Sequence, residues 1–123
     1  MGLDQNAFAH KGALPQPTDF EPKPEEISEL FYWRKHADLE GWMEKLYREK
    51  GGKEEVFNVA TVELTMQDID RLERDVLADS LPHTEGFFFG KSHPEDKEAT
   101  LKFIGLARET LRGGDSVFYT SWW

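Results

Sequence analysis

The stretch from Ser92 to Trp123, SHPEDKEATLKFIGLARETLRGGDSVFYTSWW, contains a predicted helix that passes directly into a predicted strand. The apolar residues of the helix recur at spacings of three and four, on a face formed by Phe103, Ile104, Ala107 and Leu111. Gly113-Gly114 ends the helix, and residues 117–123 (VFYTSWW) have the aromatic and β-branched composition of a strand. The C-terminal quarter therefore indicates a fold in which helices alternate with strands.

The residues before this stretch predict how the helix begins and what precedes it. Ser92 followed by Glu95 fits a capping box, which predicts that the third helix starts there. The run Gly86–Gly90 (GFFFG) is aromatic, lies between two glycines and is too short for a helix. We therefore predict a strand at residues 86–90.

A second strand and helix are predicted further upstream. Residues 57–64 (FNVATVEL) are rich in β-branched side chains, which favours a strand. Thr65, with Asp68 three residues later, forms a weaker version of the capping box and predicts the start of the second helix.

The first predicted helix runs from Ser28 to Lys50. Its buried stripe, again at spacings of three and four, consists of Tyr32, His36, Leu39, Met43 and Leu46. Gly51-Gly52 ends this helix. Residues 3–9 predict a short strand, and residues 10–26 an extended connector, because prolines interrupt helices and strand ladders.

These elements together predict an α+β fold. The chain of 123 residues fits a single domain, 1–123, in which one small, mainly antiparallel sheet packs with about three helices. The connections are short, and the sequence leaves the strand order open.

Composition excludes several classes of function. The chain has 15 Lys+Arg against 24 Asp+Glu, a net charge of −9, which disfavours binding to nucleic acids and to anionic membranes. It contains no cysteine, which excludes disulfides and thiolate chemistry. No window is apolar enough for a transmembrane helix, and no targeting segment is recognisable, so we expect a cytoplasmic protein.

The histidines and serines do not form the patterns of metal-binding or catalytic sites. No two of the four histidines have the i, i+3 or i, i+4 spacing of paired ligands on a helix, although His83 and His93 could approach Glu85 or Asp96. There is no G-x-S-x-G motif. We therefore predict no catalytic residue, no metal and no cofactor, and regard a non-enzymatic role as more consistent with the sequence.

Aromatic and basic side chains cluster at one place in the sequence, residues 32–36 (YWRKH). One interpretation is a ligand or partner site in which Trp33 stacks and Arg34 or Lys35 holds an anion. The other is structural: Tyr32 and His36 are hydrogen-bonded in the core, and Arg34 pairs with an acid such as Asp4 or Glu63. The large excess of acids favours the structural interpretation.

The C-terminal strand supplies a second aromatic cluster. Consecutive strand residues face opposite sides, so one of Trp122 and Trp123 faces away from the helices. We hypothesise that this aromatic face is a contact surface, and that two copies of the chain pair through it. The candidate contact residues are Tyr32, Trp33, Arg34, Lys35, His36, Tyr119 and Trp122.

Several motifs resemble a family of small, uncharacterised proteins of marine bacteriophages, including cyanophages. The resemblance is carried by MGLD at 1–4, YWRKH at 32–36, GFFFG at 86–90 and the terminal FYxSW at 118–122. It implies a phage-encoded protein in the cytoplasm of a host cell and implies no activity. Relatives typically carry Asn and His where this chain has Ala37 and Glu40.

Two functions of different classes follow from the sequence. The first is an auxiliary, non-enzymatic interaction module that binds a host or phage protein, because the chain is acidic, rich in aromatics and without a catalytic motif. The alternative is a small enzyme or ligand-binding domain whose pocket is lined by the aromatic and basic residues of the two clusters. This alternative predicts that six residues converge around a cavity and that Arg34 is unpaired; the six are Tyr32, Trp33, Arg34, His36, Tyr119 and Trp122.

Overall fold

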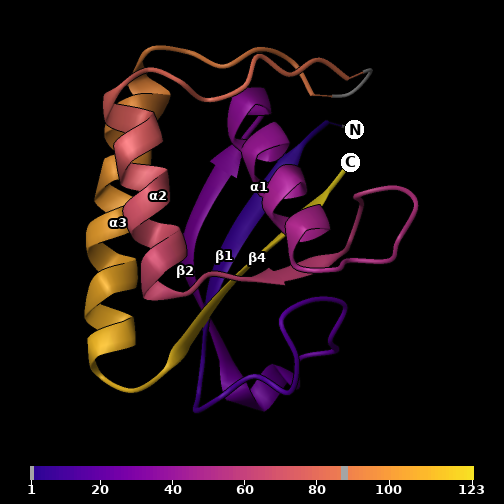
Figure 1. Ribbon diagram of the computed structural model, residues 1–123, viewed down its shortest axis with the longest axis vertical. Helices are drawn as coiled ribbons and strands as arrows, with labels where there is room; N and C mark the ends of the chain where they lie inside the picture. Colours follow the sequence, from indigo (N-terminus) through magenta and orange to yellow (C-terminus); the bar gives the residue numbers. More distant parts are fainter. Residues whose placement is uncertain (1, 87–88) are drawn as a thin grey trace.

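A four-stranded antiparallel sheet forms the centre of the molecule (Figure 1). In their order across the sheet the strands are β2 (Ile27–Arg34), β1 (Asp4–His10), β4 (Ser116–Trp122) and β3 (Thr61–Glu63). The helices are α1 (Ala37–Glu49), α2 (Met66–Leu77), α3 (Glu95–Arg112) and the short 3-10 turn η1 (Pro24–Glu26). The structure is a computed structural model that describes residues 2–86 and 89–123. The predicted α+β fold, one antiparallel sheet with three helices, is confirmed.

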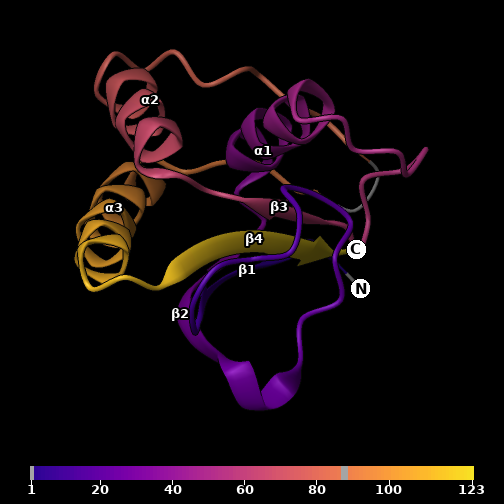
Figure 2. The ribbon, with the colours of Figure 1, turned by 60° about the horizontal axis from the view of Figure 1, so that its bottom comes forward.

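The three helices lie on one face of the sheet, and the connector runs along the free edge of β3 and onto the other face (Figure 2). Helices α2 and α3 pack side by side. The core between the helices and the sheet is closed by fully buried side chains from every layer, among them Leu39, Met43, Ile69, Leu72, Phe103, Val117 and Tyr119.

The connector covers only part of the second face. There Phe8 stacks on Phe118 at 5.4 Å between ring centroids, and Phe20 of the connector packs edge-on against Phe118 at 5.2 Å. The connector is held to the edge of the sheet where the Asp19 N–H donates to the Thr61 carbonyl at 3.1 Å. The prolines therefore lie in an irregular segment that places one aromatic side chain against the sheet.

The predicted first helix was wrong over its N-terminal part. Residues 27–34 form strand β2, and the helix begins only at Ala37. Side chains alternate along this segment, since Trp33 is buried while Tyr32 and Arg34 are exposed, and this is the period of a strand. Lys35 adopts a left-handed conformation (φ 57°) and donates its N–H to the Leu3 carbonyl at 2.8 Å. The segment is therefore a strand because it pairs with β1, although its apolar residues also have the spacing of a helix.

The predicted strands were correct at the two ends of the chain and too long or wrong in the middle. Strands β1 and β4 lie within one residue of the predicted ranges. Of the predicted strand 57–64 only Thr61–Glu63 is a strand, because Val59 is left-handed (φ 62°). Gly86, Phe89 and Gly90 of the predicted strand 86–90 are not in a strand, and residues 87–88 lie outside the described part of the chain.

Of the two predicted capping boxes, one is confirmed. The Thr65 Oγ1 accepts from the Asp68 N–H, and the Asp68 carboxylate accepts from the Thr65 N–H, so α2 starts as predicted. The box at Ser92 is wrong: α3 begins at Glu95, and the side chain that folds back is Asp96, which accepts from the His93 N–H at 2.7 Å. The Ser92 hydroxyl instead contacts His36 and Asp38, which are distant in the sequence.

Candidate functional site

The sheet separates the predicted contact residues into two groups. Tyr32, Arg34 and Trp122 lie on the second face of the sheet, whereas Trp33 and Tyr119 are buried beneath the helices. Lys35 is exposed in the link that follows β2, and His36 is buried at the start of α1. The seven residues therefore do not line one pocket, contrary to the alternative drawn from the sequence.

The part of the second face that the connector leaves uncovered, hereafter the open half, carries the exposed aromatics. Asp4 of β1 lies between Arg34 of β2 and Trp122 of β4 in the register of the sheet. Trp122 is 69% exposed and Tyr32 47%. The Tyr32 hydroxyl donates to the Asp4 carboxylate at 2.5 Å, and this bond raises the pKa of Tyr32. The two aromatic side chains thus flank one carboxylate.

Neither predicted partner of Arg34 is used. Asp4 accepts from Tyr32, and Glu63 lies in β3, at the opposite edge of the sheet from Arg34 in β2. Within residues 2–86 and 89–123, Arg34 makes no ion pair, and its side chain is exposed. The predicted structural pairing of Arg34 was therefore wrong, and its charge faces solvent on the open half.

A buried polar network ties the start of α1 to the sheet. The Gln5 amide donates to the His36 carbonyl (3.0 Å) and to the Tyr119 hydroxyl (2.9 Å), and accepts from the His36 N–H (2.9 Å). Tyr119 and Ser121 donate to the two carboxyl oxygens of Glu40 at 2.6 and 2.8 Å. Burial raises the pKa of Glu40 to about 7. Every polar atom of the Glu40 carboxyl has a partner, so this network holds structure together.

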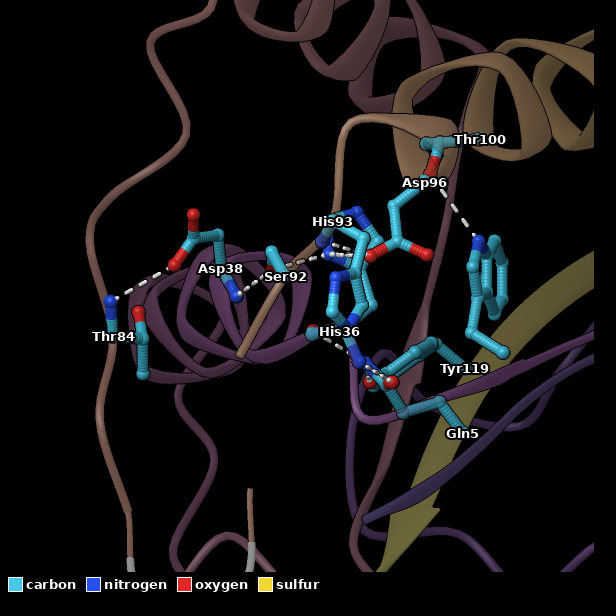
Figure 3. A network of polar contacts seen from close by, with 10 residues as sticks. Gln5, His36, Asp38, Thr84, Ser92, His93, Asp96, Thr100 and Tyr119 are labelled. Carbon is cyan, nitrogen blue, oxygen red and sulfur yellow. Dashed lines mark hydrogen bonds and ion pairs between the residues drawn. The ribbon is translucent and has the colours of Figure 1, made fainter. Parts of the chain in front are cut away.

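The His36 side chain belongs to a second cluster, shown in Figure 3. Its Nδ1 lies 2.7 Å from the Ser92 Oγ, which also accepts from the Asp38 N–H at 3.0 Å. The Asp96 carboxylate lies 3.8 Å from the same ring nitrogen. His36 is the N-cap residue of α1, but its side chain makes no capping bond; Ser92 supplies that bond from the far end of the loop.

The other ring nitrogen of His36 is unsatisfied. The side chain is 4% exposed, and within the described residues Nε2 is buried without a hydrogen-bond partner. Burial lowers the pKa of His36, although Asp96 and Asp38 act in the opposite direction. The ring is therefore neutral near pH 7, and half of its hydrogen-bonding capacity is unused.

A cleft of about 290 Å³ opens beside this cluster, between the start of α1, the end of α2 and the start of α3. Its walls are formed by His36, Asp38, Val76, Asp79, Leu81, Ser92, His93, Pro94, Lys97 and Thr100. A second hollow of about 310 Å³ lies on the other side of Asp38 and Ser92, towards His83 and Lys91. The Asp38–Ser92 contact is thus the wall shared by two hollows.

The arrangement resembles the serine–histidine pair of a hydrolase but differs from it in orientation. In a catalytic triad the serine and the carboxylate lie at opposite ring nitrogens, whereas here Ser92 and Asp96 both approach Nδ1 of His36. Taking up a proton would bury a charged ring with an unpartnered N–H, and burial already lowers its pKa. The geometry therefore favours binding over general-base catalysis.

Metal-binding side chains do not converge in the described part of the chain. No group of three or more His, Asp or Glu residues there is placed to hold a metal ion. His83 and Glu85 do approach each other, at 3.4 Å, but both are exposed. His93 lies elsewhere, on the wall of the cleft beside His36.

No family model, curated protein or solved structure matched this chain. Its function must therefore be argued from its own geometry. None of its helices within residues 2–86 and 89–123 has the length and apolar character needed to cross a membrane.

The sequence singled out His36 but not its partners. Ser92 and His36 are 56 residues apart, and Ser92 has a local role in the sequence pattern, as a capping residue of α3. Asp38 contributes its backbone N–H to Ser92 and its carboxylate to the Thr84 N–H, at 3.1 Å. No motif of adjacent residues contains this information. The one usable signal was His36 itself, a polar residue at the start of a helix whose side chain is not one that caps helices well.

Proposed function

We propose that the protein is a non-enzymatic interaction module that binds another protein through the open half of the sheet. The observation that carries the proposal is the exposure of two large aromatic side chains, Trp122 (69%) and Tyr32 (47%). Both lie next to Asp4. Large aromatic side chains are enriched in protein interfaces and dominate their binding energy. These uncovered aromatic side chains therefore form a surface that another protein can bind.

The two halves of the same face support this interpretation. In the covered half, the connector places Phe20 against Phe118, and the aromatic side chains there are packed away from water. In the open half no segment of the described chain performs this role. Asp4, Asn6 and Arg34 add polar groups beside the aromatic side chains of the open half, and protein interfaces combine these two kinds of group.

Charge indicates the kind of partner. The net charge of −9 favours association with a basic protein surface and opposes nucleic acid. The phage resemblance suggests that the partner is a host or phage protein, met in the cytoplasm of the host cell. A second copy of the same acidic chain is a less favourable partner electrostatically, and it remains testable as a homodimer.

The test is selection of partners from a displayed library of bacterial and phage protein fragments, with purified wild-type protein as bait. We expect enriched fragments to be basic and to bind the Trp122→Ala and Tyr32→Ala variants at least about tenfold more weakly, as for interface hot spots. Leu77→Ala is the matched control, because Leu77 is an exposed apolar residue (57%) on α2, remote from the sheet face.

The outcomes separate the hypotheses. If no fragment is enriched, or if the fragments bind Trp122→Ala as tightly as the wild type, the open half is not the interaction surface. Analytical ultracentrifugation of the bait addresses self-association. A dimer that dissociates in Trp122→Ala, but not in Leu77→Ala, would identify the partner as a second copy of the chain.

A further inference from the structure

The cleft beside His36 is chemically distinct from the open half, because it lies on the helical side of the sheet. Three kinds of group meet there. Val76 and Leu81, with Pro94, provide apolar wall. Asp38 provides a carboxylate and Lys97 an ammonium, and His36 provides a buried ring nitrogen with no partner.

The contacts of Ser92 favour the His36 tautomer that carries its proton on Nε2. The Ser92 Oγ accepts from the Asp38 N–H, so its own proton is free to be donated. The nearest acceptor is the His36 Nδ1, at 2.7 Å. Donation in this sense satisfies both groups and leaves the ring proton on Nε2. In this tautomer His36 offers a buried N–H donor that has no acceptor among the described residues.

The charged side chains of the cleft differ in how much of their hydrogen-bonding capacity is used. Asp79 and Lys97 form an ion pair at 3.1 Å, but both side chains are more than one-third exposed and each retains unused hydrogen-bonding capacity. Within residues 2–86 and 89–123, the Asp38 carboxylate accepts through Oδ1 only, from the Thr84 N–H. The cleft thus presents a carboxylate oxygen on one wall and cationic or N–H donors on the others, beside an apolar surface.

We propose that this cleft binds a small zwitterionic molecule of amino-acid size. The ammonium group of the ligand pairs with Asp38, and its side chain contacts Val76 and Leu81. Its carboxylate accepts from Lys97 and, by displacing the groups that bury this atom, from the His36 Nε2–H. The volume of about 290 Å³ lies at the lower end of the range for pockets that enclose drug-sized ligands, about 300–1,000 Å³, and so favours a smaller molecule.

The neighbouring charges explain why a molecule with both charges fits better than a simple ion. Asp38, Asp79 and Asp96 around the cleft repel a free anion, whereas a free cation can pair with Asp38 but gives His36 and Lys97 no acceptor. A zwitterion places each of its charges against the complementary wall and brings no net charge into the site.

The test is thermal denaturation of the wild-type protein with each of the common L-amino acids in turn, with acetate and methylamine as single-charge controls. A ligand at about ten times its Kd raises the Tm of a domain of this size by about 5 °C. We expect a subset of amino acids with apolar side chains to raise the Tm, and neither acetate nor methylamine to do so.

Variants assign any shift to the cleft. Asp38→Asn and Lys97→Ala remove one charge each, and His36→Asn removes the Nε2 donor; all three are expected to abolish the ligand-dependent rise in Tm. Trp122→Ala, on the open half, is the matched control and is expected to retain it. Nitrogen NMR of the imidazole provides an independent readout, because the resonance of the His36 Nε2 must move when an acceptor binds.

The proposal fails if no amino acid raises the Tm, or if the rise persists in both Asp38→Asn and His36→Asn. It also fails if the ligand leaves the Nε2 resonance unchanged. Since Trp122→Ala tests the open half alone, a negative result in the cleft leaves the proposed interaction surface to stand or fall by its own test.

Discussion

Glu40 and His36 are four residues apart at the start of α1, and both side chains are buried, yet their surroundings differ. Both carboxyl oxygens of Glu40 have hydroxyl donors, from Tyr119 and Ser121. Among the described residues, the His36 ring has a hydrogen-bond partner at Nδ1 but none at Nε2. A buried polar group with every partner in place stabilises one arrangement, whereas an unsatisfied one beside a cleft is a candidate for contact with a ligand.

The largest effect is expected when the satisfied group loses a partner. Burial raises the pKa of Tyr119, so its hydroxyl keeps its proton, donates to Glu40 and accepts from Gln5. Tyr119→Phe should lower the free energy of unfolding by about 3 kcal/mol, because two buried groups lose a partner. Urea denaturation measures this difference.

Tyr32→Phe is the matched control for this prediction, since its hydroxyl also donates to a carboxylate, but at the surface. It should lower the free energy of unfolding by less than about 1 kcal/mol. If both variants lose the same free energy of unfolding, the buried hydrogen bonds of Tyr119 stabilise the protein no more than the exposed bond of Tyr32 does.

The pH dependence of stability tests the same network without removing it. The pKa of Glu40 rises from 4.5 to about 7 on folding, so its contribution to stability is fully present below pH 4.5 and is lost as the pH rises through 7. The contribution is on the order of 3 kcal/mol. In Glu40→Gln this component of the pH dependence should disappear.

The measurement is urea denaturation of the wild type and of Glu40→Gln between pH 4.5 and 8.5, with the difference between the two taken at each pH. Other titrating groups are common to both proteins and cancel. If the difference does not change with pH across this range, Glu40 is not protonated in the folded protein near neutrality.

An intermediate effect is expected at the contact shared by both hollows. Ser92→Ala removes the cap of the Asp38 N–H and the hydroxyl that lies 2.7 Å from the His36 ring nitrogen Nδ1. The free energy of unfolding should fall by about 1–2 kcal/mol, the range for loss of a helix cap. Ser80→Ala, at an exposed serine, should have a smaller effect; a loss in Ser92→Ala no greater than this would argue against the capping role.

The smallest effect is expected at the unsatisfied group itself. Asn is among the best N-cap residues, so His36→Asn can cap α1 from within the helix while it removes an imidazole with an unpartnered nitrogen. The free energy of unfolding should change by less than about 1 kcal/mol. A decrease in the free energy of unfolding as large as that of Tyr119→Phe would show that the His36 side chain stabilises the fold as much as the Glu40 network does.

The sequence predicted more of the fold than of the candidate site. The terminal strands, α2 with its capping box and the body of α3 follow from local periodicity and local hydrogen bonds. The segment 28–36 was misassigned because its aromatic residues satisfy two periods. Tyr32 and His36 have helical spacing, while the burial of Trp33 between exposed neighbours has the spacing of a strand.

The aromatic clusters were located correctly along the chain but not in space. Tyr32 and Trp122 share the open half, as the hypothesis of an aromatic surface requires, but Trp33 and Tyr119 face the core. Neighbouring strand residues point to opposite sides, so the assignment of a helix to 28–36 also assigned these side chains to the wrong faces.

By itself the sequence determined the acidic charge, the α+β class and the elements whose hydrogen bonds are local. The tertiary structure alone decided that residues 27–34 pair with β1, that Gln5 and Tyr119 close the network on Glu40, and that Ser92 turns from its own helix to His36. The physical reason is the same in each case. Buried polar groups and strand edges are satisfied by whichever partner the packed chain brings near, and that partner is distant in the sequence.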